Sequence, residues 1–153
     1  MSVLTKGVGG GGKIKQYGFT RSLNHGYGAA GDYSDFTATC STSSFYSGSV
    51  WYPLTQILDQ KETANSFTYT FTFTEPQEII GFSFWWGGGT SDRWLKGYTL
   101  SFSDDGTTYT VLGENSALTS IQTMQDFEHT SAGKHKYWKL YLNSNNRCRS
   151  RNN

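Results

Sequence analysis

The feature that most constrains the fold is the stretch of residues 66–74, in which aromatic side chains alternate strictly with threonine. Phe67, Tyr69, Phe71 and Phe73 occupy every second position, and a threonine follows each of them. Successive side chains of a β-strand point to opposite faces of a sheet, whereas a helix would spread these rings around its circumference. The stretch therefore predicts a strand with a buried aromatic face and a hydroxyl face that is solvated or pairs across strands.

The segments that follow continue the β pattern. We expect a break at residues 75–77, because proline cannot donate to a ladder, and then a strand at residues 79–86 that is buried on both faces. Residues 94–103 alternate again. Residues 107–112 are expected to return as their hairpin partner across a tight turn at residues 104–106.

Two more strands are expected at residues 120–128 and 137–142. About seven or eight short strands without an amphipathic helix between them predict an all-β protein, an antiparallel β-sandwich over residues 37–142. The composition agrees, because aromatic residues make up 16% of the chain and glycine is frequent, with 18 copies. We expect no membrane span and no signal peptide, since no long apolar run occurs.

Two segments flank the predicted sandwich. Residues 1–36 hold nine of the 18 glycines together with several large apolar side chains, which a solvated linker usually lacks. We therefore expect a Gly-rich N-terminal arm that lies against its own domain or a neighbouring subunit. Residues 143–153 are polar and basic and predict an exposed or partner-facing tail.

The charge balance argues against nucleic acid as a partner. The chain carries 13 basic and 12 acidic side chains, a net charge of +1. Only Arg147, Arg149 and Arg151 in the tail offer a local basic cluster. We therefore do not expect nucleic acid as a partner.

Several motifs, taken in order, resemble the discoidin or coagulation factor C-type domain, a jelly roll of the galactose-binding-like class. Residues 52–59 (YPLTQILD) are similar to the early Tyr-Pro to Leu-Asp stretch of that family, and residues 79–84 to its apolar third strand. Residues 94–106 (WLKGYTLSFSDDG) are similar to its most recognisable strand and turn, and residues 136–142 to its closing strand. The resemblance implies a jelly roll over residues 37–142, with ligand-binding loops gathered at one rim.

The resemblance also implies a metal site and a disulfide. Sugar-binding relatives hold a structural Ca²⁺ ion at the loop where Asp59 and Thr63 stand here, but the glycine, asparagine and tryptophan of that loop and a closing acidic residue are missing. A structural calcium ion therefore stays one of two alternatives, the other being a loop that binds no metal. Some relatives join the two ends of the domain by a disulfide, and Cys40 and Cys148 stand where it would close. Free thiols are the favoured alternative, because no secretion signal is visible.

Catalysis is not expected. His25, His129 and His135 show neither zinc-binding nor triad spacing. Asp104 and Asp105 are adjacent carboxylates, but they fall in the predicted hairpin turn, where their ordinary role is to shape the turn. The sequence therefore favours a binding protein over an enzyme.

Carbohydrate is the ligand class that the loops favour, because sugars are held by ring stacking and a few polar groups. Candidate residues flank the glycines at 87–89 or precede residue 59. They are Tyr46, Trp51, Tyr52, Trp86, Asp92 and Arg93. A core position for Trp86 and a solvated charge for Arg93 stay open as alternatives.

Two functions follow from these features. The first is a non-enzymatic accessory protein of a phage or viral virion, serving as decoration, adaptor or adhesion module and assembled in the host cytoplasm. Its partners would be neighbouring virion subunits, reached through the arm in a homo-oligomer or larger assembly, or a cell-surface glycan. The alternative is an extracellular carbohydrate-binding module, either independent or cut from a bacterial glycan-active protein.

Overall fold

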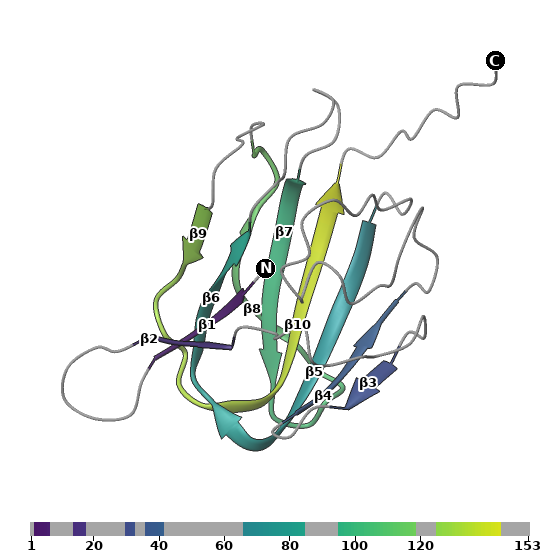
Figure 1. The fold of residues 1–153 in the computed structure, drawn as a ribbon, viewed down its shortest axis with the longest axis vertical. Helices are drawn as coiled ribbons and strands as arrows, with labels where there is room; N and C mark the ends of the chain where they lie inside the picture. Colours follow the sequence, from purple (N-terminus) through teal and green to yellow (C-terminus); the bar gives the residue numbers. More distant parts are fainter. Residues whose placement is uncertain are drawn as a thin grey trace.

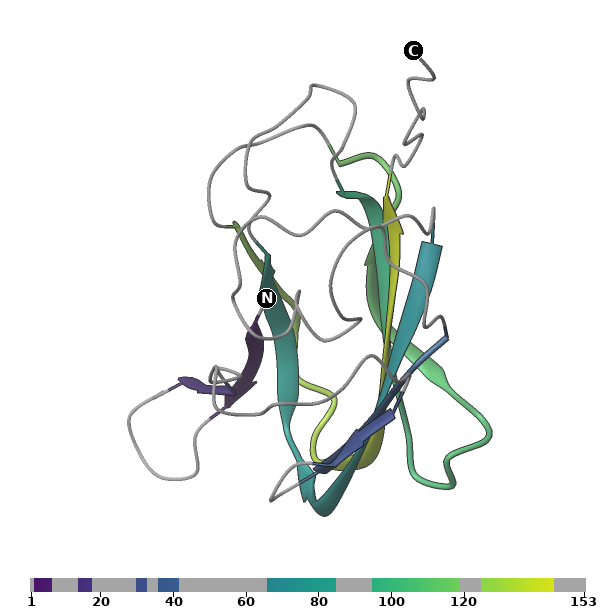
Figure 2. The ribbon, with the colours of Figure 1, turned by 45° about the vertical axis from the view of Figure 1, so that its right-hand side comes forward.

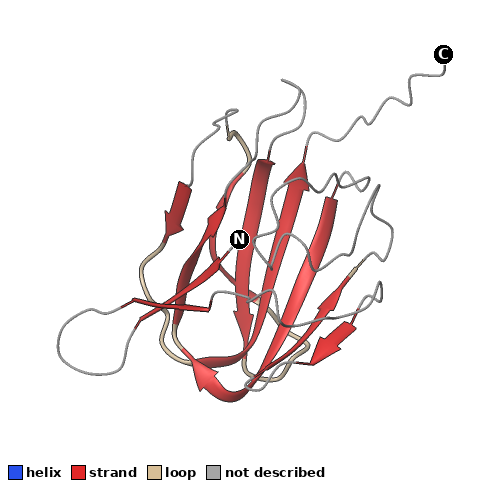
Figure 3. Ribbon diagram, viewed as in Figure 1, coloured by secondary structure: helices blue, strands red, loops and turns tan. Residues whose placement is uncertain are grey.

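The computed structural model describes residues 2–6, 14–17, 30–32, 36–41, 66–84, 95–118 and 125–144. All regular elements in these ranges are β-strands, which lie in two antiparallel sheets (Figures 1 and 3). Within the described ranges, no helix is long and apolar enough to cross a membrane. The all-β class predicted from the sequence is confirmed.

The strands are named in chain order. They are β1 (Ser2–Lys6), β2 (Ile14–Tyr17), β3 (Ala30–Asp32), β4 (Phe36–Cys40), β5 (Ser66–Gln77), β6 (Ile79–Phe84), β7 (Leu95–Ser103), β8 (Thr110–Asn115), β9 (Gln125–Glu128) and β10 (His135–Ser144). One sheet has the order β2-β1-β6-β9, and the other has the order β3-β4-β5-β10-β7-β8. Figure 2 shows the two sheets as separate layers of a sandwich.

The core lies between the layers and contains the rings that alternate along β5. Tyr69, Phe71 and Phe73 are at most 2% exposed, so the predicted aromatic face is buried. The side chain of Phe67 is outside the described part of the structure. In β10, Trp138 is completely buried and pairs across the sheet with Phe71. Burial of each such side chain stabilises the fold by about 1.5–3 kcal/mol.

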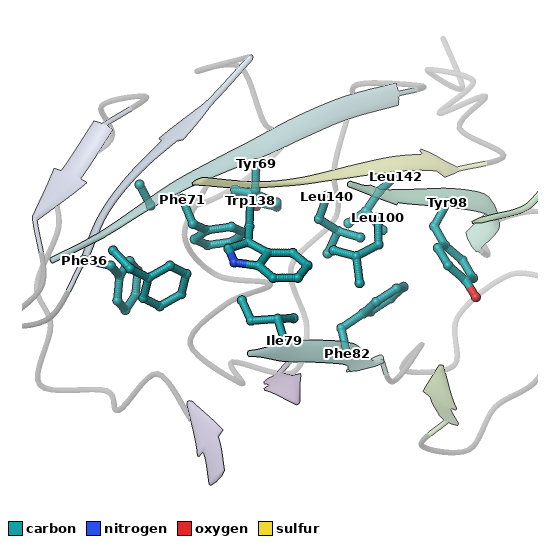
Figure 4. Packing of buried hydrophobic residues seen from close by; sticks show 12 residues of the cluster. Phe36, Tyr69, Phe71, Ile79, Phe82, Tyr98, Leu100, Trp138, Leu140 and Leu142 are labelled. Carbon is teal, nitrogen blue, oxygen red and sulfur yellow. The ribbon is translucent and has the colours of Figure 1, made fainter. Parts of the chain in front are cut away.

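The smaller sheet contributes the other wall of the core. Ile79 and Phe82 of β6 are at most 1% exposed and point toward β10 and β7 (Figure 4). Gly81 lies between these positions in the chain, and a Cβ there would overlap the backbone carbonyl of Phe127 in β9. Glycine at this position therefore lets β9 approach β6 closely.

The outer face of the larger sheet carries the hydroxyl groups. Thr72 pairs with Thr37, and Thr70 pairs with Thr39, so threonines of β5 and β4 lie side by side. Thr68, Thr70 and Thr72 are partly exposed. This arrangement agrees with the expected cross-strand pairing of the hydroxyl face.

Three short strands occur within the predicted arm, where no strand was expected. β1 lies between β2 and β6 in the smaller sheet, with Val3 opposite Phe82. β3 pairs with β4 at the edge of the larger sheet. The described parts of residues 1–36 therefore lie against the sandwich itself.

Two details of the predicted strands were wrong. β5 continues through Pro76 to Gln77 instead of ending at the predicted break. The ladder between β5 and β10 shifts its register between His135 and Tyr137. The proline therefore lies at an irregular, exposed end of the strand, where a regular ladder hydrogen bond from its backbone nitrogen is not required.

The predicted start of β8 was also wrong. β8 begins at Thr110 rather than at residue 107, because the side chain of Asp105 accepts hydrogen bonds from the backbone N–H groups of Thr107 and Thr108.

Candidate functional site

One end of the sandwich collects the strand ends that flank the predicted ligand-binding segments. We call this end the rim. It includes Ser41, Ser66, Phe84, Leu95, Gln125 and Ser144, together with Asn115 at the end of β8 and residues 116–118 after it. Pairing places these ends together, since Ser66 lies opposite Asn143, and Ser144 lies opposite Leu95. In the smaller sheet, Phe84 lies opposite Gln125.

An aromatic cluster lies between the two sheets, next to the rim on the core side. The rings of Phe82, Tyr98 and Phe127 have centroids 4.8–5.0 Å apart, and the ring of Tyr98 meets that of Phe82 edge to face. Leu118, at the rim, also packs against the core. The cluster therefore gives the rim a rigid, apolar base.

The polar end of this cluster is satisfied by a histidine. The hydroxyl of Tyr98 lies 3.0 Å from Nε2 of His129, and the two rings lie 5.8 Å apart. Burial raises the pKa of Tyr98, so its hydroxyl stays neutral. The backbone N–H of His129 donates to the carbonyl of Ile80, which fixes the histidine beside β6. The pair therefore joins the two sheets.

Exposed polar side chains surround the described part of the rim. Ser66, Lys96 and Asn115 are exposed, and Asn143 is partly exposed. Asn115 also shapes the chain, because its side-chain oxygen accepts a hydrogen bond from the backbone N–H of Ala117. None of these residues was among the candidates predicted from the sequence. Only their position at the ends of predicted strands could have pointed to them, and that position alone does not indicate a binding role.

The candidate ligand-binding residues lie outside the described residues. They fall within two segments, residues 42–65 and residues 85–94. The first segment joins Ser41 to Ser66, and the second joins Phe84 to Leu95. All four flanking residues belong to the rim. The roles of Tyr46, Trp51, Tyr52, Trp86, Asp92 and Arg93 therefore stay predictions.

The same limit applies to the predicted calcium site and disulfide. Asp59 and Thr63 are outside the described residues, as is Cys148. The backbone of Cys40 ends β4 opposite Tyr69, but its side chain is not described. Within the described part of the chain, no group of three or more metal-ligating side chains occurs.

The opposite end of the sandwich is closed by connections between strands. In the turn between β7 and β8, Asp105 accepts hydrogen bonds of 2.8 Å from the N–H groups of Thr107 and Thr108 and from the hydroxyl of Ser103. These donors, the backbone groups first, hold the pKa of Asp105 well below its usual range. Gly106 has a φ of 74°, as the predicted tight turn requires. Asp105 therefore shapes the turn, as predicted from the sequence, whereas Asp104 contacts His135.

The architecture is that of the galactose-binding-like β-sandwiches, which include the discoidin-like domains. A solved structure with this fold is CpGH89CBM32-5 from Clostridium perfringens, in complex with GalNAc-β-1,3-galactose. The similarity covers 70% of this chain and 83% of that one, with a TM-score of 0.52 and 17% sequence identity. No family model matches the sequence, and no curated protein matches it either.

Proposed function

We propose that this protein is a non-enzymatic carbohydrate-binding module and that its ligand site lies at the rim. The observation that carries the proposal is the placement of Ser41, Ser66, Phe84 and Leu95 at one end of a galactose-binding-like sandwich. Both segments with the candidate aromatic and charged residues are attached there. The fold of a carbohydrate-binding protein from Clostridium perfringens supports the ligand class.

The chemistry of the two segments suits a sugar. A sugar ring presents an apolar face that stacks on indole or phenol rings, and hydroxyl groups that bind planar polar side chains. Trp86 follows Phe84 by two residues, and Arg93 precedes Leu95 by two residues. In this proposal Trp86 supplies the stacking surface, and Arg93 and Asp92 hold sugar hydroxyls.

The biological setting is a separate part of the proposal. The Gly-rich N-terminal segment and the basic tail favour an accessory protein of a phage or viral particle, in contact with neighbouring subunits. A bacterial carbohydrate-binding module fits the fold equally well. Glycan binding is common to both settings, so it is the property to test first.

The test is binding of the intact chain to an array of galactose- and N-acetylgalactosamine-containing glycans. We expect a defined set of hits, and we expect Trp86→Ala and Arg93→Ala each to weaken binding to those hits at least about tenfold, or roughly 1.4 kcal/mol. The matched control is Tyr109→Ala, which removes a partly exposed ring from the opposite end of the sandwich. Circular dichroism of each variant checks that the β fold is retained.

Two results would overturn the proposal. One is a folded wild-type chain that binds no glycan on the array. The other is binding that survives both rim substitutions and is lost in Tyr109→Ala. In the virion setting, light scattering of the intact chain should also show a homo-oligomer, whereas an independent module should be a monomer.

A further inference from the structure

His135 begins β10 at the end of the sandwich opposite the rim, and its side chain is 12% exposed. The imidazole ring stacks on Phe102, with centroids 4.0 Å apart and planes 23° apart. It also meets Trp138 edge to face, and Nε1 of Trp138 donates a hydrogen bond to the carbonyl of His135. The position of the ring is therefore fixed from two sides.

Both nitrogens of this ring face hydrogen-bond acceptors. Nδ1 lies 2.8 Å from Oδ1 of Asp104, and Nε2 lies 3.1 Å from the carbonyl oxygen of Ala132. A neutral imidazole has one N–H group and one lone pair, whereas an imidazolium donates from both nitrogens. Only the protonated ring of His135 can therefore make both hydrogen bonds.

Two neighbours of the ring also interact favourably with a cation, whereas burial of the ring opposes its charge. The face of Phe102 attracts positive charge through its ring quadrupole. The carboxylate of Asp104 carries the opposite charge, although its side chain is 78% exposed and its attraction is screened by solvent. Hydrogen bonding and ring stacking thus act in the same direction as the ion pair.

Other charged side chains lie at this end of the sandwich. Asp105 is bound within the turn by Ser103 and backbone N–H groups. Glu78, which follows β5, accepts a hydrogen bond from the hydroxyl of Ser131. Lys134 and Lys136 flank the histidine in the chain and oppose its positive charge.

We propose that His135 is a proton-dependent clasp that ties the turn between β7 and β8 to the segment between β9 and β10. With the ring protonated, Asp104 of the turn and Ala132 of the segment are bound to the same side chain. When the ring loses a proton, one of the two hydrogen bonds is lost, so the ring no longer binds both connections.

His129 provides an internal comparison. Its Nε2 faces the hydroxyl of Tyr98, which can either donate or accept a hydrogen bond. A neutral ring therefore satisfies this contact, and no clasp of the same kind is expected at His129.

The first test is nitrogen NMR of the histidine rings in the intact wild-type chain. We expect both nitrogens of His135 to carry hydrogen at the acid end of a pH series, and one of them to lose it as the pH rises. Over the same range, hydrogen-exchange protection in residues 103–108 and 129–134 should fall roughly two- to tenfold, the equivalent of one hydrogen bond. Protection in the β5–β10 ladder should not change.

The variant His135→Gln completes the test, because glutamine cannot donate in both directions or carry the charge. We expect its protection in the two connections to be independent of pH, whereas the matched variant His129→Gln should keep the wild-type dependence. A ring of His135 that carries a single protonated nitrogen throughout the pH series would overturn the clasp. So would an unchanged pH dependence in His135→Gln. The NMR measurement decides the question alone if that variant does not fold.

Discussion

The imidazole ring of His129 fills the space that a side chain at Gly113 would need. A Cβ on Gly113 would overlap three atoms of that ring. Gly113 belongs to β8 of the larger sheet, and His129 follows β9 of the smaller sheet. This contact and the hydrogen bond to Tyr98 hold the two layers together at one edge of the sandwich.

The first prediction follows from this contact. Gly113→Ala should reduce the free energy of unfolding by about 1–3 kcal/mol, because the new methyl group must displace a ring that is held by Tyr98. Urea denaturation measures the change. In the double variant Gly113→Ala, His129→Ala, the methyl group has space, so part of the loss due to the glycine substitution should disappear. Equal losses with and without His129 would contradict the packing argument.

The second prediction concerns the centre of the core. Trp138→Ala should cost about 3–5 kcal/mol, because the side chain is completely buried and its removal leaves a cavity. Tyr141→Ala is the matched control from the same strand, since Tyr141 is 39% exposed on the outer face. We expect its effect to stay below about 1 kcal/mol in the same denaturation experiment. A comparable loss in both variants would show that the two faces of β10 are assigned incorrectly.

The third prediction is a dependence of stability on pH at Asp105. The hydrogen bonds in the turn hold its pKa well below the usual range, so the folded state binds a proton there less readily than the unfolded state. Asp105 therefore stabilises the fold above about pH 4, the ordinary aspartate pKa, and this contribution is lost as the pH falls further. The difference in unfolding free energy between wild type and Asp105→Ala should shrink in acid. A difference that grows in acid would give the opposite sign and refute the assignment.

The fourth prediction concerns calcium. Because the loop containing Asp59 and Thr63 lacks several residues of the calcium-binding relatives, we expect a chelator to leave the unfolding temperature unchanged. Differential scanning calorimetry with EDTA and then with excess CaCl₂ measures this. A fall with EDTA that CaCl₂ reverses would establish a structural calcium ion, and Asp59→Asn should then reproduce the fall.

The fifth prediction concerns the two cysteines. We expect Cys40 and Cys148 to be free thiols, so both should react with a thiol reagent in denaturant without added reductant. Mass spectrometry counts the labels. Labelling of neither residue before reduction, and of both after it, would demonstrate the bridge implied by the discoidin resemblance.

The central strands could be predicted from the sequence because apolar and polar side chains alternate along a strand that buries one face. Tyr69, Phe71 and Phe73 are buried as expected, and β7 and β10 occur where period-two patterns or apolar runs were found. The turn at Gly106 was also predictable, because few residues besides glycine adopt its positive φ. These features depend on neighbouring residues alone.

Features that depend on distant partners were not predictable in the same way. β1 is a strand because it pairs with β6, and nothing in its five residues signals that partner. The start of β8 was misplaced because the side chain of Asp105, rather than the strand ladder, binds the intervening backbone. At the site, polar residues such as Lys96 and Asn115 could not be identified as rim residues until the fold showed that the strand ends lie together.

The interior position of β1 restricts how the N-terminal segment can be studied. Deleting it would uncover the backbone hydrogen-bonding groups along one side of β6 and create a sticky edge on the smaller sheet. A shortened chain could then aggregate for reasons unrelated to any natural assembly. Point substitutions that leave β1 in place are therefore the better test of whether this segment contacts a second copy of the chain.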